Sequence, residues 1–186
     1  MRERFKGADF GQGGNRVKGM LNIIAGGILF LSSAYIGLQI KRHYRRRRDF
    51  FADAVEFIDT LSDEIAFLKT PLPRIIARFC DTKKSDFTYA LTAYASLINE
   101  GKATEIQSLA AALNLNKLSN PEKDIVLGLL SGLGKTDADT PLVTLKNYRA
   151  KLEAALKVCE NQYKTTGMLS YKLGVLIGIG IMIFVA

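Results

Sequence analysis

The side chains that could do chemistry in this sequence are few, and their spacing matches no catalytic pattern. His43 is the one histidine, and Cys80 and Cys159 stand far apart without CxxC spacing. A zinc site needs about four N, S or O ligands with closely spaced pairs, and a nucleophilic triad needs a histidine with a partner on each side. We therefore expect no enzyme activity, no metal and no cofactor. One disulfide is possible, but a cytoplasmic location favours reduced, buried thiols.

The segment GLGKTD, residues 132–137, resembles a phosphate-binding loop. In the pattern GxxxxGK[ST], with Gly134 as the second glycine, the first would stand at position 129, where the chain has Leu129. The segment also follows a helical pattern, whereas a phosphate loop follows a strand. We therefore interpret Gly134 as the end of a helix rather than as part of a nucleotide site.

Positive charge is concentrated at the start of the chain. The formal net charge is +8, and residues 1–48 hold eleven Lys and Arg against two acidic residues. From Asp49 onward, fifteen Lys and Arg face sixteen Asp and Glu. A nucleic-acid-binding domain would spread basic residues over a folded face and often interleave aromatic ones. We therefore expect no nucleic-acid partner.

An uncharged apolar segment lies inside this basic region. Residues 20–40, MLNIIAGGILFLSSAYIGLQI, are twenty-one residues without a charge, and about twenty helical residues cross a hydrocarbon core of ~30 Å. The alternative is a cleaved signal peptide. Signal peptides usually have a shorter apolar core, and the arginine cluster that follows this segment would oppose translocation of the downstream chain. The sequence therefore predicts an uncleaved transmembrane helix over residues 20–40.

The end of the chain is apolar again. Residues 173–186, LGVLIGIGIMIFVA, have no charge and no polar face. They are too short to span alone, so we expect the second transmembrane helix to cover residues 168–186, with the Lys172 ammonium reaching back to the headgroups. A buried amphipathic helix is the alternative.

The basic cluster KRHYRRRRDF, residues 41–50, sets the predicted orientation. Positive residues beside membrane helices stay in the cytoplasm. We therefore expect a protein of the bacterial cell membrane whose residues 49–167 lie on the cytoplasmic side. The basic residues of segment 1–19 weaken this bias; that segment is a flexible leader, or translation starts at Met20. Anionic lipid headgroups are expected partners of a membrane-surface set of basic side chains: Lys41, Arg42, Arg45, Arg46, Arg47, Arg48 and Lys172.

The sequence predicts helices throughout residues 49–167. Apolar residues recur there at spacings of three and four, and no stretch shows the alternation of apolar and polar residues that is typical of a strand. The predicted fold is all-α, a cytoplasmic bundle of about six helices whose first and last members continue into the transmembrane helices. Thr70 and Pro71 suit the start of a second helix and Ser85 the start of a third, which Gly101 ends. Further helices are expected over 103–113, over 120–134 and from Thr140 on, with Gly167 as a place where the last one bends.

Acidic residues follow the outer face of the first cytoplasmic helix. They are either a solvated face or a docking surface for a basic partner: Asp49, Asp53, Glu56, Asp59 and Asp63. The residues that we select as candidate partner contacts are three of these and two turn residues: Asp53, Glu56, Asp63, Pro71 and Asp137. Asp137 can equally be an ordinary loop residue before a helix.

Three segments together resemble the family of stage III sporulation protein AB of endospore-forming bacteria. They are LSDEIAFLKTPLP (61–73), LSNPEKDIVLGLLSGLGKTDAD (118–139) and YKLGVLIGIGIMIFVA (171–186). The resemblance implies a reduced version of the F-type inner-membrane platform protein of type II secretion, on the mother-cell side of the channel to the forespore. It also implies two kinds of partner, an ATPase similar to stage III sporulation protein AA and the other membrane subunits of the complex.

The sequence leaves three functions open. The leading one is a non-enzymatic membrane scaffold that couples an ATPase to a channel. An intramembrane transporter or enzyme subunit would need ionisable groups inside the spans, and only Lys172, near an edge, is present. A general lipid-surface binding protein would need neither the second span nor the helical body.

Overall fold

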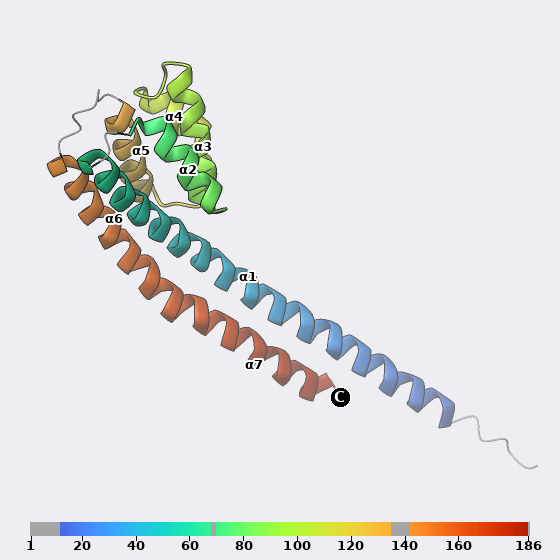
Figure 1. Cartoon of the computed structure of the whole chain (residues 1–186). Helices are drawn as coiled ribbons and strands as arrows, with labels where there is room; N and C mark the ends of the chain where they lie inside the picture. The colour runs from blue at the N-terminus through green and yellow to red at the C-terminus, as the bar shows by residue number, and fades with distance from the viewer. Residues whose placement is uncertain (1–11, 68–69, 135–141, 186) are drawn as a thin grey trace, which may run out of the picture. The chain divides into compact units, whose positions relative to one another are not determined.

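The computed structural model describes residues 12–67, 70–134 and 142–185. This described chain is all-helical, as the sequence predicts (Figure 1). The helices are α1 (Gln12–Phe67), α2 (Leu72–Thr82), α3 (Asp86–Asn99), α4 (Ile106–Ala112), α5 (Asn120–Gly134), α6 (Leu142–Gln162) and α7 (Met168–Val185). A π-helical turn, Tyr163–Gly167, joins α6 to α7, at the place where a bend was expected.

The chain divides into two compact units. One is His43–Lys164, which we call the helical body. The other combines Met1–Arg42 with Thr165–Ala186, and we call it the helix pair. Helix α1 begins at Gln12, within segment 1–19, so residues 12–19 belong to this helix.

The hydrophobic core of the helical body is built on the part of α1 that follows the basic cluster. Residues at spacings of three and four put one face of this helix inward, and they are all buried: Phe50, Phe51, Ala54, Phe57, Ile58 and Leu61. The Phe57 ring lies edge-on to Phe79 of α2 and to Phe87 of α3, with centroids 5.3 and 5.8 Å apart, a favoured aromatic geometry. From there each helix packs on the next, α2 on α3, α3 on α4, α4 on α5 and α5 on α6.

Local signals set the helix ends of the body. The Ser85 hydroxyl accepts from the Thr88 N–H, and the Thr88 hydroxyl accepts from the Ser85 N–H, a capping box that starts α3 as expected. Gly101 has φ 73° just after α3, the left-handed conformation that glycine adopts without steric cost. The expected role of Thr70 was wrong: its hydroxyl donates to Glu64 Oε2 at 2.8 Å, and α2 begins after Pro71 without a side-chain cap.

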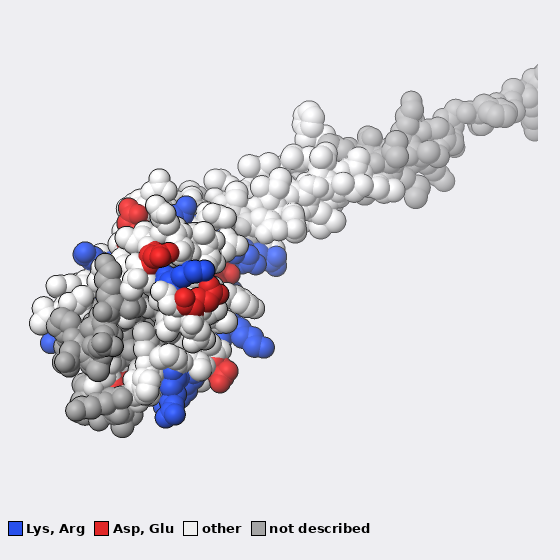
Figure 2. Space-filling model, turned by 90° about the horizontal axis from the view of Figure 1, so that it is seen from above, with Lys and Arg blue, Asp and Glu red and all other residues white. Residues whose placement is uncertain are grey.

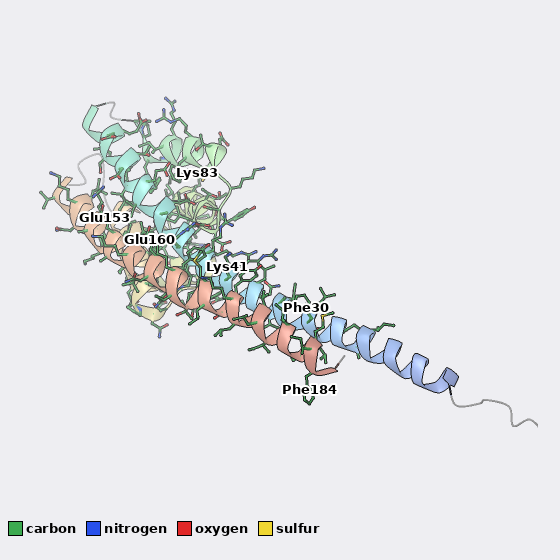
Figure 3. The ribbon with its side chains drawn as sticks, turned by 90° about the horizontal axis from the view of Figure 1, so that it is seen from below. Phe30, Lys41, Lys83, Glu153, Glu160 and Phe184 are labelled. Carbon is green, nitrogen blue, oxygen red and sulfur yellow. The ribbon has the colours of Figure 1, made fainter. Side chains whose placement is uncertain are left out.

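In the helix pair, α1 and α7 meet through glycines. A Cβ atom on Gly37 would lie 2.9 Å from the Ser170 carbonyl oxygen, and one on Gly174 would lie 2.9 Å from the Ser33 carbonyl oxygen. The Ser33 hydroxyl donates to the Gly174 carbonyl at 2.8 Å. Further along, a Cβ atom on Gly178 would lie 2.7 Å from a ring carbon of Phe30, the side chain labelled in Figure 3. The two helices therefore run antiparallel, close enough for backbone-to-backbone contact.

The outward faces of the helix pair are apolar. Large hydrophobic side chains on both helices are exposed, for example Ile28 and Leu31 on α1 and Ile183 and Phe184 on α7. Two helical stretches are long and apolar enough to cross a membrane, Ile24–Ile65 and Val143–Phe184. An aqueous solvent would penalise so much exposed apolar surface, whereas lipid would not.

Candidate functional site

The basic residues between the apolar segment and the body have different surroundings. In the helix pair, Lys41 Nζ lies 4.9 Å from the centroid of the Tyr171 ring, a cation–π contact, and Arg42 and Lys172 are exposed. In the helical body, Arg45 and Arg46 are exposed. The four exposed side chains have the accessibility that contact with lipid headgroups requires, whereas Lys41 is half-buried.

Arg47 and Arg48 differ from this expectation. The Arg48 guanidinium lies 4.9 Å from the centroid of the Tyr163 ring and pairs with Asp49. Arg47 points into the body, with 14% of its side chain exposed. Its membrane-surface assignment is therefore corrected: hydrogen bonds inside the body, not lipid headgroups, occupy its two terminal nitrogens. The physical reason is helical spacing, because Arg47 shares the inward face of α1 with Phe51 and Ala54.

A buried ion pair ties α1 to α5 and α6. Arg47 Nη2 donates to Glu122 Oε1 at 2.7 Å, and Nη1 donates to Gln162 Oε1 at 3.1 Å. Glu122 Oε2 accepts from the Ser119 backbone N–H at 2.7 Å, so the same carboxylate also caps the start of α5. Cys159 Sγ lies 3.5 Å from Glu122 Oε1. This arrangement fixes three helices together by charge-assisted hydrogen bonds.

The surroundings shift the ionisation of both acidic groups in the cluster. Burial alone would raise the pKa of Glu122, but the hydrogen bonds from Ser119 and Arg47 and the charge of Arg47 outweigh it, so the net pKa is lowered. Burial, and then the charge of Glu122, raise the pKa of Cys159 to about 11. The cluster at neutral pH is therefore an ionised carboxylate beside a protonated thiol. Both cysteines are free, as the sequence predicts, although Cys80 is only half-buried.

The acidic face of α1 is partly neutralised from within the body. Lys83 Nζ bonds Asp53 Oδ1 at 3.1 Å and also pairs with Glu56. Burial lowers the pKa of Lys83, but its bonds to Glu56 and Asp53 outweigh this effect and raise it overall. The Arg149 guanidinium of α6 bonds Asp59 at 2.5 Å. Figure 2 shows red and blue side chains next to one another on the face of the molecule that it presents.

The other candidate partner contacts are less enclosed. Asp63 is exposed on α1, and Pro71 is exposed at the start of α2. Asp137 lies outside the described residues. The structure therefore brings Asp53 and Glu56 together around Lys83, a residue that the sequence alone did not single out. Within the described ranges, no group of three or more His, Cys, Asp or Glu side chains could hold a metal ion.

Residues of the glycine contact also escaped the sequence reasoning. Gly174 and Gly178 have the small-xxx-small spacing that lets membrane helices approach closely, and Ser33 and Gly37 have it on α1. This spacing was a signal that could have predicted the pairing.

A helical body carried by two candidate membrane-spanning helices defines a class of small helical membrane protein. The model of one family, stage III sporulation protein AB, matches residues 22–186, so the chain belongs to the stage III sporulation protein AB family. The two candidate spans fit a membrane protein of a sporulation family. The comparison with curated proteins found no match, and the comparison with solved structures found none either.

Proposed function

We propose that the chain is a non-enzymatic membrane scaffold of the channel complex between mother cell and forespore. Its helical body lies in the mother-cell cytoplasm and docks an ATPase of the stage III sporulation protein AA type, as a secretion-platform-like protein would. Other membrane subunits of the stage III sporulation A complex bind the helix pair. The observation that carries this proposal is the combination of one compact body, with its own core, and two paired apolar helices.

The charged surface of the body supports docking through α1. Asp53 and Glu56 share one ammonium, that of Lys83, so two carboxylates face one cation. Asp63 adds an exposed carboxylate farther along the same helix. A basic partner surface would complete the neutralisation, and charge complementarity of this kind governs the rate and orientation of association.

Co-flotation of the ATPase with vesicles tests the proposal. The full chain is reconstituted into vesicles, and purified AA-type ATPase is added at increasing concentration. We expect saturable recovery of the ATPase with vesicles that contain the chain. Asp63→Lys and the double variant Asp53→Lys/Glu56→Lys should each weaken binding about fivefold, the effect of lost contacts at an exposed interface.

Two controls separate docking from folding. Glu100→Lys makes the same charge change on an exposed residue at the end of α3 and should leave binding unchanged. Adding Lys83→Glu to the double variant restores opposite charges inside the body, so it should recover stability but not ATPase binding. Absence of saturable binding by the unmodified chain would contradict the docking proposal.

A further inference from the structure

Two adjoining cavities in the helical body share hydrogen-bonding residues, and the wall of the smaller one also has two arginines. The smaller, about 20 Å³, is lined by Arg46, Arg47 and Phe50 of α1, by Asp86 of α3 and by residues of the loop before α5. The larger, about 220 Å³, lies between α3 and the same loop, with Tyr89, Ala90 and Ala93 on its α3 side. Asp86, Asn114 and Lys117 line both cavities, so we treat them as one site and call it the basic pocket.

Hydrogen-bond donors of three kinds meet in the basic pocket. Arg46 is exposed and forms no ion pair with any carboxylate of the described residues. Arg47 Nε is buried and, within the described chain, has no hydrogen-bond acceptor, whereas buried donors almost always have one. Lys117 adds an ammonium and Asn114 an amide.

The one carboxylate in the wall is already engaged. Asp86 Oδ2 lies 2.9 Å from Lys117 Nζ, in a pair of which both members are well exposed to solvent. An exposed pair of this kind contributes little to folding. An anion can therefore share Lys117 with Asp86, and the site remains positive because Arg46 is not neutralised.

The place of the pocket in the chain indicates the kind of anion. Arg46 stands six positions after Ile40, the last residue of the uncharged segment 20–40, and six residues span at most about 20 Å even when fully extended. A wall of Arg, Lys and Asn donors suits the several acceptor oxygens of a phosphate group. Apolar side chains beside them, Phe50 and Tyr89, suit a ligand with a less polar portion.

We propose that the basic pocket binds a phosphate group, supplied by an anionic phospholipid headgroup, with Arg46 and Lys117 as its charged ligands and Asn114 as a neutral donor. Asp86 opposes this binding by competing for Lys117. The pocket differs from the acidic face that we assign to the ATPase. Failure of ATPase docking would therefore leave this proposal untouched.

Native mass spectrometry of the full chain tests the proposal. The chain is released into mild detergent from nanodiscs that contain equal amounts of phosphatidylglycerol and phosphatidylcholine, and the retained lipids are counted. We expect one phosphatidylglycerol per chain, in preference to phosphatidylcholine. Lys117→Gln and Arg46→Gln should each lower its retention about tenfold, the effect of one charge-assisted hydrogen bond.

Asp86→Asn provides the sharpest comparison. Both Lys117→Gln and Asp86→Asn break the same ion pair, so a merely structural role predicts that they act alike. The proposal predicts opposite signs, because Asp86→Asn frees Lys117 and should raise retention. Lys84→Gln removes an exposed cation that does not line the pocket and should change nothing.

A second arm identifies the source of the phosphate. Inorganic phosphate is added to the lipid-free chain in detergent, and the thermal unfolding midpoint is measured. A midpoint that rises in the unmodified chain but not in Lys117→Gln, without selective lipid retention, would support phosphate binding with a soluble source. Equal retention of both lipids with no effect of phosphate, or changes of the same sign in Lys117→Gln and Asp86→Asn, would overturn the proposal. So would a loss of ATPase co-flotation in Lys117→Gln without any lipid effect, since that indicates an acidic protein partner.

Discussion

Glu122 links two helices of the body, because it accepts hydrogen bonds from Arg47 of α1 and from the Ser119 backbone N–H at the start of α5. Glu122→Gln keeps the shape of the side chain but removes its charge, which leaves the Arg47 guanidinium buried without a counterion. We expect the free energy of unfolding to fall by about 3 kcal/mol, measured by urea unfolding of the full chain in detergent. Glu100→Gln, which affects an exposed pair with Lys102, should change it little.

The same residue predicts a dependence on pH. The pKa of Glu122 is lowered in the folded chain from its ordinary value of 4.5, so its contribution is fully present above that value and is lost as the pH falls through the folded pKa. The difference in unfolding free energy between the unmodified chain and Glu122→Gln should be constant above about pH 5.5 and shrink below 4.5. A difference that persists unchanged into acid would show that charge is not the cause.

The two thiols should react at very different rates. Cys159 is buried, and with a pKa of about 11 only about one molecule in a thousand is ionised there at pH 8. Cys80 is half-buried. We expect maleimide to label one cysteine in the folded chain, and Cys80→Ser to abolish that labelling until urea is added. Fast labelling of Cys159 in the Cys80→Ser variant would show that the Glu122 cluster opens.

At the scale of the element, the contact between α1 and α7 depends on glycine. Gly174→Leu would place a side chain where a Cβ already meets the Ser33 carbonyl at 2.9 Å, whereas Gly180 has nothing within 4 Å of its Cβ position. We expect Gly174→Leu to separate the helices and Gly180→Leu to leave them paired. Spin labels at the exposed residues Tyr35 and Leu176, in a chain with both native cysteines replaced, would show a longer and broader distance distribution for Gly174→Leu alone.

The sequence predicted the elements better than their contacts. Apolar spacing predicted α1 to α6, and the signals at Ser85, Gly101 and Asn120 placed helix ends correctly, because they act within a few residues of the chain. Thr70 was misassigned because a distant carboxylate, that of Glu64, competes for its hydroxyl. Local rules contain no information about such a competitor.

At the scale of the whole molecule, the candidate site could be predicted only in part, because local rules contain no information about distant charged partners. The basic cluster and the acidic face were both visible as runs of charge. Which side chains of these two runs remain unpaired depends on residues from other parts of the body: Lys83, Glu122 and Arg149. Pairing with residues far away in the sequence thus distinguishes Arg47, whose side chain is mostly enclosed by the body, from exposed cations such as Arg46.

The most direct test of a membrane scaffold with a cytoplasmic body is the side of the membrane on which that body lies. A membrane-impermeant maleimide is applied to cells that carry the chain with both native cysteines replaced and one new cysteine, either Lys84→Cys on the body or Phe184→Cys at the end of α7. Both positions are exposed. We expect Lys84→Cys to be labelled only after the cells are opened and Phe184→Cys to be labelled in intact protoplasts. Labelling of Lys84→Cys in intact protoplasts would contradict a body that docks a cytoplasmic ATPase.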